Sequence, residues 1–593
     1  MKVLKQLLSI LSKTDRMKLL GLTCLMLFSS LLDIIGVGSI IPFLKIVGNP
    51  ALLSTYSLGE VLISTFHLQS SDKIILSAGM LLGLFFLFKS IYYIWYWNLT
   101  MSFIQDRTMD IMRRLYSIYL SRSFIYFTNR NPAELIRNLS IEATNAGGTL
   151  KVITIIFTEL IVLLGILGLL FFVEPTATLG AIIVLGPIVF LIYYISKKKL
   201  SVLSKERVYY HAQMLKWINQ GIGGIKEIKI LQREQFFLNK FEKIGRGYTN
   251  TQKQSAVINA FPRAIIEASA ILSIISLIIY LILAKGNIER ILPILGFFGV
   301  AIVRLIPSFT RLINALNNYR FLSASVSEIW ADIQLESAPS KNIEDTLVNP
   351  TLNFRESIGL KNIYFSYSKE SKYVIQNISL KIPKGKVTAI VGSSGAGKTT
   401  LINLILGLLT PIRGTLHIDN QTCEGQTKSW KRLFAYIPQD IYILDDTIRR
   451  NIAIGIPDGE IDDNKIWESL KIAKLDQFVD GLENGLATVA GDRGMGISGG
   501  QRQRLGIARA LYFNADILVF DEATSSLDLE TERQIIESIY DLAGKKTILI
   551  VTHKLSLIKK CDNIYWLENG KVEQQGDYLH LFSNTNPFIQ VKN

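Results

Sequence analysis

Before about residue 320, this 593-residue chain contains several apolar runs that are unusually long. A helix needs about 20 consecutive apolar residues to cross the hydrocarbon core of a bilayer. Only helices and closed barrels satisfy their backbone polar groups inside lipid. We therefore expect a bundle of membrane-spanning helices. The six predicted spans are residues 17–47, 74–103, 148–173, 177–197, 255–284 and 291–318.

The apolar pattern changes after about residue 350. There, short apolar stretches alternate with helical stretches, which is typical of a soluble α/β domain. The chain is also too long for one ordinary domain. The expected fold is therefore an all-α membrane domain with six helices at 1–325, a linker at 326–350, and an α/β domain at 351–593.

The distribution of Lys and Arg predicts which loops face the cytoplasm. The connection from 48 to 72 contains no Lys or Arg, whereas the connections 104–146 and 198–254 are dense in both. Because cytoplasmic loops are enriched in Lys and Arg, the two dense loops, the N-terminus and the C-terminal half are expected there. Segment 48–72 is predicted either as a small amphipathic helix on the outer face or as an irregular loop.

The net charge of +15 is compatible with nucleic acid, anionic lipid or an anionic substrate as partner. Basic membrane loops account for it more simply, so no nucleic-acid partner is expected. The N-terminal stretch MKVLKQLLSILSKTDRMK predicts an amphipathic helix on the inner membrane surface and not a signal peptide. The cysteines match no metal spacing and are predicted to be free thiols: Cys24, Cys423 and Cys561.

The sequence VTAIVGSSGAGKTTLINLILGLL contains the pattern G-x-x-x-x-G-K-[ST] between an apolar strand and a helix. Backbone N–H groups of such a loop wrap phosphates, and the helix N-terminus favours negative charge. Lys398 is expected to reach the β- and γ-phosphates of ATP, and the Thr399 hydroxyl to coordinate Mg²⁺. The predicted ATP-binding residues here are Gly392, Ser393, Ser394, Gly395, Ala396, Gly397, Lys398, Thr399 and Thr400.

A second apolar strand, in ADILVFDEATSSLD, ends in two acidic residues. Ligands of parallel α/β sheets bind where the strands end. Asp521 suits the Mg²⁺ shell, and Glu522 suits the general base that polarises the attacking water. The alternative, an acidic helix cap, is disfavoured by the neighbouring phosphate loop. The α/β domain is therefore predicted to be a P-loop ATPase with Mg²⁺ as its cofactor.

Between these two motifs lies GISGGQRQR, residues 496–504. With it, the C-terminal half resembles the nucleotide-binding domain of ABC transporters. The signature of that family commonly reads LSGGQ, and Ile497 replaces its leucine here. Glycines allow the backbone to approach phosphate, and a helix is expected to begin just afterwards. The matching signature residues are Ser498, Gly499, Gly500 and Gln501.

The resemblance implies roles for further residues. Tyr367 lies where the family stacks an aromatic ring on adenine, and Gln439 lies where it senses Mg²⁺ and meets the membrane domain. His553 lies at the family's γ-phosphate switch. The catalytic residues implied are Glu522, His553 and Gln439, and the metal ligands implied are Thr399, Gln439 and Asp521.

The two halves together resemble an exporter-type ABC half-transporter, placed as a multi-pass protein in a bacterial inner membrane. In this family the signature of one subunit closes on the phosphate loop of another, so a homodimer with two ATP sites is expected. Segments 129–145 and 219–234 resemble the first and second coupling helices, which dock near Gln439 and Asp492. Residues 525–528 match the family's dimer-contact loop.

Ionisable residues inside the spans are the best indication of what is carried. Arg304 and Arg311 are seven residues apart, so they lie on nearly one helical face, about 10.5 Å from each other. With Arg263 they are expected in the inner half of the membrane, where guanidinium groups grip phosphate or pyrophosphate. Alternatively, Arg263 and Glu267 neutralise each other, and Arg311 pairs with a cytoplasmic acid. The span charges recognised are Asp33, Lys89, Arg263, Glu267, Arg304 and Arg311.

Two patches, 259–267 and 303–313, resemble the PglK-type lipid-linked oligosaccharide flippases. That resemblance implies ATP-driven movement of a polyprenyl-pyrophosphate-linked oligosaccharide from the inner to the outer leaflet, for protein glycosylation. The substrate residues implied are Arg263, Arg304 and Arg311. The alternative is an ABC exporter of other lipids, drugs or peptides. Three arginines favour an anionic or other phosphate-bearing lipid over a cationic drug.

Overall fold

The chain divides into two compact units. The first comprises Met1–Ser121 and Asn131–Ser340, and the second comprises Arg122–Arg130 and Lys341–Asn593. The computed structural model describes residues 2–48, 70–128, 130–285, 288–334, 352, 354–368, 372–423, 428–491, 496–522, 529–552 and 554–582.

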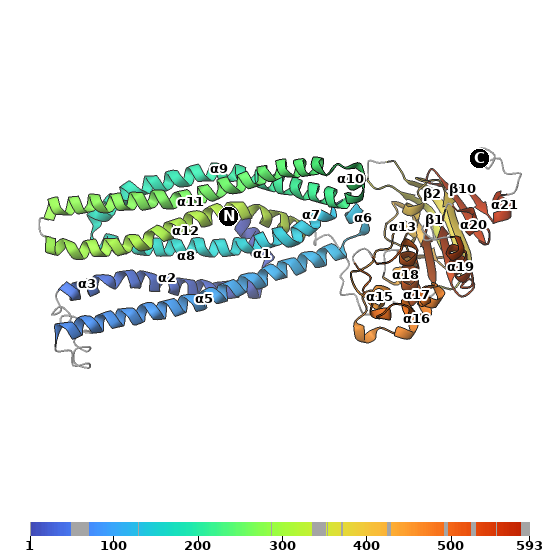
Figure 1. The fold of residues 1–593 in the computed structure, drawn as a ribbon, viewed down its shortest axis with the longest axis horizontal. Helices are drawn as coiled ribbons and strands as arrows, with labels where there is room; N and C mark the ends of the chain where they lie inside the picture. The colour runs from blue at the N-terminus through green and yellow to red at the C-terminus, as the bar shows by residue number, and fades with distance from the viewer. Residues whose placement is uncertain are drawn as a thin grey trace. The chain divides into compact units, whose positions relative to one another are not determined.

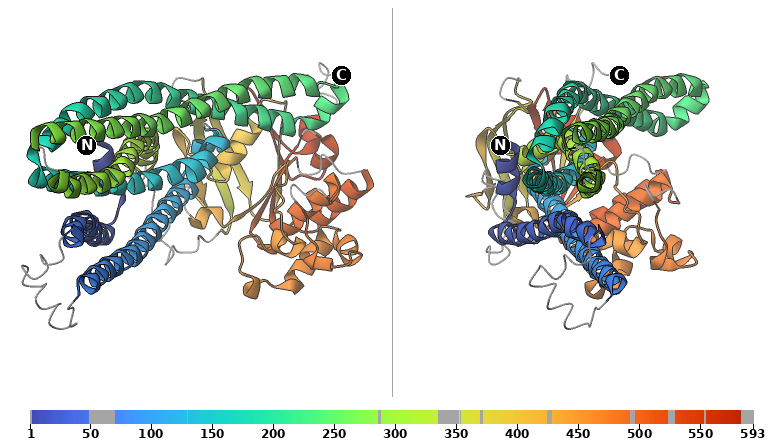
Figure 2. Two further views of the ribbon diagram at one scale, coloured as in Figure 1. Left: turned by 60° about the vertical axis from the view of Figure 1, so that its left-hand side comes forward. Right: turned by 90° about the vertical axis from the view of Figure 1, so that its left-hand side faces the viewer.

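The described part of the first unit is helical throughout, and α8 runs along α12 while α9 runs along α11 (Figures 1 and 2). This pairing buries one side of each long helix. The helices are α1 (Lys2–Ile10), α2 (Lys13–Gly38), α3 (Ile40–Gly48), α5 (Ser71–Ser121), α7 (Pro132–Arg137), the π-helix η2 (Asn138–Glu142), α8 (Ala143–Val173), α9 (Pro175–Gly223), α10 (Ile225–Leu231), α11 (Glu234–Lys285) and α12 (Ile288–Gln334).

The structure has long helices where the apolar runs predict membrane spans. The predicted spans 177–197 and 255–284 lie inside the long helices α9 and α11. Among the described residues, four further stretches are long and apolar enough to cross a membrane. These are Lys13–Gly48, Ser71–Ser121, Pro132–Val173 and Phe298–Gln334.

A single residue, Glu174, joins α8 to α9. Its backbone leaves the helical region, at φ −150° and ψ 88°. Pro175 then opens α9, where the missing N–H of proline leaves no hydrogen bond unmade. The predicted spans 148–173 and 177–197 leave only three residues between them, and the structure places the corner between two long helices there.

The N-terminal helix α1 packs on the C-terminal part of α12. Leu7 is buried. The Ser327 hydroxyl donates to the Gln6 side-chain oxygen at 3.3 Å, and the Trp330 indole N–H donates to the Ser9 hydroxyl at 3.1 Å. Two polar residues of α1 therefore contact α12 directly, and the placement of α1 on the inner membrane surface stays a prediction.

The second unit is α/β (Figure 1). One sheet has the order β10-β9-β3-β8-β7-β6, parallel except at β10, and a second, antiparallel sheet has the order β2-β1-β4-β5. The strands are β1 (Ser357–Phe365), β2 (Ile375–Pro383), β3 (Val387–Gly392), β4 (Arg413–Ile418), β5 (Gln421–Cys423), β6 (Phe434–Ile437), β7 (Ile517–Asp521), β8 (Thr547–Val551), β9 (Asn563–Glu568) and β10 (Lys571–Gly576).

Helices surround these sheets, and most of them are short. They are α6 (Phe124–Thr128), α13 (Lys398–Ile405), α14 (Lys428–Lys431), α15 (Ile448–Ile452), α16 (Asp463–Ile472), α17 (Asp476–Asp480), α18 (Gly499–Tyr512), α19 (Leu529–Tyr540), α20 (Leu555–Ile558) and α21 (Tyr578–Phe582), with 3₁₀ turns at Asp458–Glu460 and Gly485–Ala487.

Both faces of the six-stranded sheet are buried. Along β7, Ile517 and Val519 belong to one apolar cluster, whereas Leu518 and Phe520 belong to the cluster on the other face. Side chains of a strand alternate between faces, so a strand covered on both sides reads as a continuous apolar run. This alternation explains why the run ILVF predicts a central strand.

The chain around the first predicted coupling segment is divided between the two units. Residues Arg122–Arg130, which include α6, belong to the ATPase unit, where Ile125 packs against an apolar cluster. From Pro132 on, the predicted segment 129–145 forms α7, η2 and the start of α8 in the helical unit. A single short turn such as α6 leaves almost no periodic pattern in the sequence, so it was not recognised, and the docking of segment 129–145 stays a prediction.

Helix α18 comes very close to Ile441 at Gly506. A Cβ atom added at Gly506 would lie 2.4 Å from Cδ1 and 2.9 Å from Cγ1 of that isoleucine, inside a buried cluster. We expect Gly506→Ala to lower the melting temperature by several degrees, because overpacking costs about 1–3 kcal/mol. Thermal unfolding of the purified chain measures this. Gly459→Ala is the matched control, since its Cβ would meet nothing within 4 Å. Equal melting of both variants would contradict the packing argument.

Candidate functional site

The phosphate loop and the acidic residues lie at the same edge of the parallel sheet. Strand β8 pairs with β3 on one side and with β7 on the other. The phosphate loop leaves the end of β3 at Gly392, and Asp521 is the last residue of β7. Because parallel strands end at one edge, residues far apart in sequence meet where ligands bind in such sheets.

Glycines shape the phosphate loop. Gly395 and Gly397 have φ values of +81° and +101°, which side chains rarely adopt. A Cβ on Gly392 would lie 2.3 Å from the carbonyl oxygen of Leu567. The Lys398 ammonium donates to the carbonyls of Gly392 and Ser393 at 2.9 and 3.0 Å. The Lys398 ammonium is thus held against the backbone of the phosphate loop, where the sequence pattern predicts that phosphate binds.

Tyr367 lies beside the helix that follows the phosphate loop. Its hydroxyl is 3.0 Å from the hydroxyl of Thr400 on α13. This contact brings the aromatic ring to the nucleotide side of the unit. Stacking of that ring on adenine stays a prediction.

Asp521 is largely buried at the end of β7. The Tyr436 hydroxyl, on the neighbouring strand β6, donates to its Oδ2 at 3.0 Å. Burial raises the pKa of the Asp521 carboxyl. The hydrogen bond from Tyr436 opposes this, the nearby Glu522 charge adds to it, and the Lys398 charge opposes it again. A cation bound there would favour the charged carboxylate, so the site is suited to a metal ion.

Glu522 has an unusual backbone for a residue with a side chain, with φ at +50°. Its N–H donates to the carbonyl of Val551 at 2.9 Å, and the Gln439 amide donates to its Oε2 at 3.2 Å. Strained backbone of this kind persists only where the surroundings hold it, and it is common at active sites. The structure therefore brings together the predicted general base and Gln439.

The donors present fit Mg²⁺. Mg²⁺ prefers oxygen ligands and is commonly bound by one or two carboxylates together with substrate phosphates and water. Asp521 supplies a carboxylate and Thr399, in the first turn of α13, a hydroxyl. Among the residues that the structure describes, no group of three or more His, Cys, Asp or Glu forms a separate metal cluster. Mg²⁺ bound with ATP would neutralise charge on the phosphates.

The signature motif forms a capped helix start. Ser498 is the N-cap of α18: Gln501 donates its backbone N–H to the Ser498 hydroxyl at 3.2 Å, and the Ser498 N–H donates to the Gln501 side chain at 2.9 Å. This reciprocal cap leaves Gly499 and Gly500 in the first turn, at the positive end of the helix. Ile497 packs against the buried cluster, as the family's leucine would. The element is therefore suited to phosphate.

Three predicted elements fall outside the described residues. They are His553, Asp492 and the loop 525–528. The roles assigned to them by resemblance remain predictions.

The span arginines have different surroundings. Arg304 forms an ion pair with Asp33 on α2, whose other oxygen binds Lys89 of α5 at 2.6 Å. Arg311 donates through Nε to Glu159 of α8 at 2.5 Å. Sequence reasoning missed Glu159, although an acid inside the apolar run 148–173 was itself the signal.

Arg263 differs from the other two arginines. Its side chain is exposed on α11, and in the described part of the chain it has no ion-pair partner. The pairing with Glu267, expected from their spacing on one helix, is therefore not found. Arg263 is available, Arg304 shares one carboxylate with Lys89, and Arg311 is neutralised by Glu159.

These features define an ATP-driven membrane transporter of the ABC class. Residues 19–305 match the family described as ABC transporter transmembrane region, and residues 375–525 match the family described as ABC transporter. The chain belongs to the ABC transporter family, as an exporter-type half-transporter whose ATPase is coupled to transport. One copy of each half implies a dimer.

The relatives agree with this class. The chain is 31% identical over 479 residues to an ATP-dependent lipid A-core flippase of Cupriavidus metallidurans, covering 80% of this chain and 79% of that protein. It is 30% identical to the heterocyst differentiation ATP-binding protein HepA of Nostoc, covering 80% and 76%. Its fold matches a bacterial Atm1-family ABC exporter with ATP bound, with a TM-score of 0.72, 21% identity and 97% coverage of each chain. None of these three names a lipid-linked oligosaccharide flippase, so only the broader class is confirmed.

Glu522→Gln tests the general-base assignment. We expect ATP turnover to fall by about 10²–10⁴-fold, because the amide cannot accept the proton of the attacking water. ATP binding should persist and trap the closed dimer. Phosphate release and retained nucleotide measure the two effects. Glu530→Gln, an exposed carboxylate on α19, is the control. Unchanged turnover of Glu522→Gln would contradict the assignment.

Arg311→Gln tests whether that arginine serves structure. It would leave the buried Glu159 carboxylate without its cation, so we expect a lower melting temperature and a lower yield of folded protein. The double variant Glu159→Gln with Arg311→Gln removes both charges and should restore much of the loss. Thermal unfolding in detergent measures both. A single variant as stable as the unmodified chain would contradict a structural role.

Proposed function

We propose that the chain forms a homodimer that uses ATP to move an amphiphilic lipid with a phosphate-bearing headgroup from the inner to the outer leaflet of a bacterial cytoplasmic membrane. The observation that carries this proposal is uncompensated positive charge on the spans. Lys89 and Arg304 share the single carboxylate of Asp33, which leaves a net charge of +1 on this cluster. Arg263 adds a further cation.

The contacts of Arg304 favour an anionic ligand. Its Nε is buried and has no hydrogen-bond partner among the described residues. An unmet donor of a cation inside a membrane domain is costly. A phosphate oxygen would satisfy it, and arginine binds phosphate through more than one N–H group. A cationic drug would instead add to the excess positive charge.

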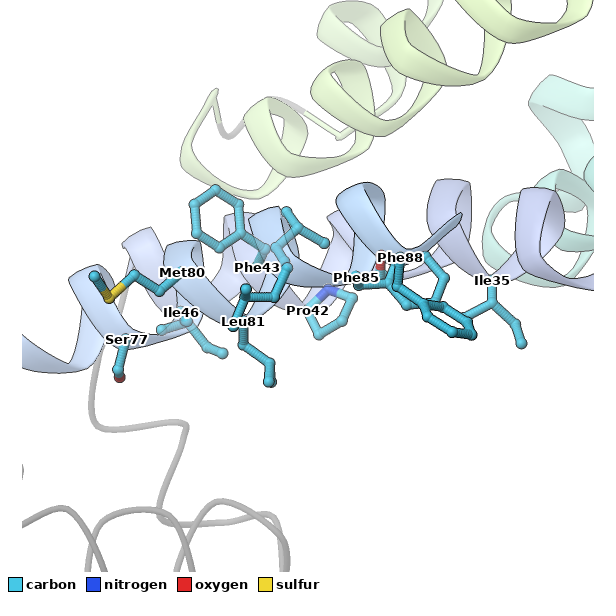
Figure 3. A pocket seen from close by; sticks show the side chains of 13 residues that line it. Ile35, Pro42, Phe43, Ile46, Ser77, Met80, Leu81, Phe85 and Phe88 are labelled. Atoms are coloured by element: carbon cyan, nitrogen blue, oxygen red, sulfur yellow. The ribbon is translucent and has the colours of Figure 1, made fainter. Parts of the chain in front are cut away.

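An apolar groove supports a cargo with a hydrocarbon tail. It has a volume of about 890 Å³ and lies between the α2–α3 stretch and α5 (Figure 3). Its lining is almost wholly apolar, with two serines as exceptions, so hydrocarbon suits it better than a polar solute. Labelled around the groove in Figure 3 are Ile35, Pro42, Phe43, Ile46, Ser77, Met80, Leu81, Phe85 and Phe88.

The tip of the α9–α11 pair supports coupling between two subunits. Ile222, Ile230 and Leu231, at and beside α10, are 66–71% exposed. Adjacent exposed apolar side chains mark an interaction surface. Docking of this tip, within the predicted second coupling segment 219–234, on an ATPase unit of the dimer would link ATP closure to the spans.

The names of the relatives narrow the chemical class proposed for the headgroup of the cargo. A lipid A-core flippase acts on a glycolipid, and the same class includes the polyprenyl-pyrophosphate glycan expected from the two sequence patches. The relatives favour a glycolipid other than that glycan. We therefore propose the shared chemistry, a phosphate-bearing glycolipid, and leave protein glycosylation as one outcome of the test.

Reconstitution in liposomes tests the proposal. Labelled lipid A-core, labelled polyprenyl-pyrophosphate glycan, a cationic drug and a peptide are offered separately, and ATP-dependent movement is followed. We expect one of the two phosphate-bearing lipids to move, and Arg263→Gln to slow that movement by about 10–100-fold, since a hydrogen bond to a charged group is worth about 1.5–3 kcal/mol.

Arg246→Gln is the matched control for Arg263→Gln, because Arg246 is an exposed arginine of the same helix, α11. It should leave movement unchanged. ATP hydrolysis should fall less than movement in Arg263→Gln. Robust movement of the drug or the peptide, with no movement of either lipid, would overturn the proposed cargo.

A further inference from the structure

Tyr436 lies on the strand next to the one that ends in Asp521. Strands β6 and β7 are parallel, and Tyr436 is the register partner of Val519. Asp521 is two residues further along β7, so its side chain leaves the same face of the sheet as that of Val519. The Tyr436 ring therefore extends along this face towards the end of β7.

The Tyr436 hydroxyl donates a hydrogen bond to Asp521 Oδ2, with 3.0 Å between the oxygens. In the described part of the chain, this is the one hydrogen bond found for the Asp521 carboxylate. It fixes one oxygen of the carboxylate and leaves Oδ1 open. A carboxylate held in this way keeps one orientation, which lowers the cost of ordering it around a ligand.

Glu522, the residue after Asp521, also receives a hydrogen bond from this part of the chain. Gln439, just beyond the strand, donates to Glu522 Oε2 at 3.2 Å. Each of the two consecutive acids thus receives a donor from β6 or from the residues that follow it. The two carboxylates thus have different donors. The donor to Asp521 is a neutral hydroxyl, so it leaves the negative charge of the carboxylate available to a cation.

We propose that Tyr436 is a positioning residue for the divalent cation that accompanies ATP. Its hydroxyl holds Asp521 Oδ2 so that Oδ1 faces the cation. The inference rests on the proposed place of Asp521 in the metal shell. Partners that orient a metal ligand from behind commonly contribute about 10–100-fold to metal affinity. Sequence reasoning passed over Tyr436, because a tyrosine in an apolar strand is expected for packing alone.

Tyr436→Phe removes the hydroxyl and keeps the ring. The test uses the full-length dimer and Mn²⁺ as the probe, whose binding with ATP is followed by electron paramagnetic resonance. We expect the apparent Kd for Mn²⁺ to rise by about 10–100-fold. Binding of ATP without metal, measured in chelator, should stay unchanged. At saturating Mg²⁺ the kcat should recover, since the chemical groups are intact.

Two further variants distinguish an error in the metal assignment of Asp521 from an error in the role of Tyr436. Tyr442→Phe is the matched control, because its ring is exposed and its hydroxyl makes no hydrogen bond within the described residues. Asp521→Asn should weaken Mn²⁺ more than Tyr436→Phe does. If Asp521→Asn leaves Mn²⁺ binding intact, the metal assignment itself is wrong.

If Asp521→Asn weakens Mn²⁺ but Tyr436→Phe matches the unmodified chain, only the role of Tyr436 is overturned. A fall in kcat that excess Mg²⁺ does not reverse, with unchanged Mn²⁺ affinity, would likewise overturn it and assign the hydroxyl to another task.

Discussion

A carboxylate among membrane helices must be neutralised, and Asp33 binds cations from two other helices. Lys89 comes from α5 and Arg304 from α12, so the ion pairs hold α2, α5 and α12 together at one point. Burying charge costs several kcal/mol unless partners compensate it. The pair of Glu159 with Arg311 joins α8 to α12 in the same way. The arrangement of the described helices therefore depends on α12, which carries both arginines.

This constraint also changes how the span charges relate to cargo. A charge that is fully paired serves the fold, and only the excess is available to a ligand. Asp33 meets two cations, and Arg263 stands apart on α11. The same chain thus combines charges that stabilise its helices with charges suited to a phosphate. Paired and available arginines look identical in the sequence.

The ATPase unit is organised by strand direction. Parallel strands deliver the phosphate loop from β3 and the acids from β7 to one edge of the sheet, with β8 between them. Strand β6 adds Tyr436 and then Gln439 at the same edge. Because β6 leads to Gln439, the strand whose Tyr436 donates to Asp521 also leads to the residue expected to meet the membrane domain. One edge therefore carries the residues proposed for the metal, for the catalytic base and for coupling.

Local patterns predicted the elements well where the physics is local. The short connection between the spans 148–173 and 177–197 and the apolar strand before Asp521 follow from a few neighbouring residues, and the structure has both. Helix α6 was not recognised in the sequence, since a one-turn helix has too few residues for a periodic signal. The bond between Tyr436 and Asp521 was also beyond prediction, since 85 residues separate the two.

The sequence by itself determined the class of this protein. Apolar runs long enough to span a bilayer, a phosphate loop, an acidic strand end and a Ser-Gly-Gly-Gln helix start each impose their physics on nearby residues. Only the tertiary structure decided which arginine is paired and which is available. Arg304 finds Asp33 across 271 positions and Arg311 finds Glu159 across 152. Such contacts depend on which helices lie side by side, and that is a property of the assembled bundle and not of any one segment.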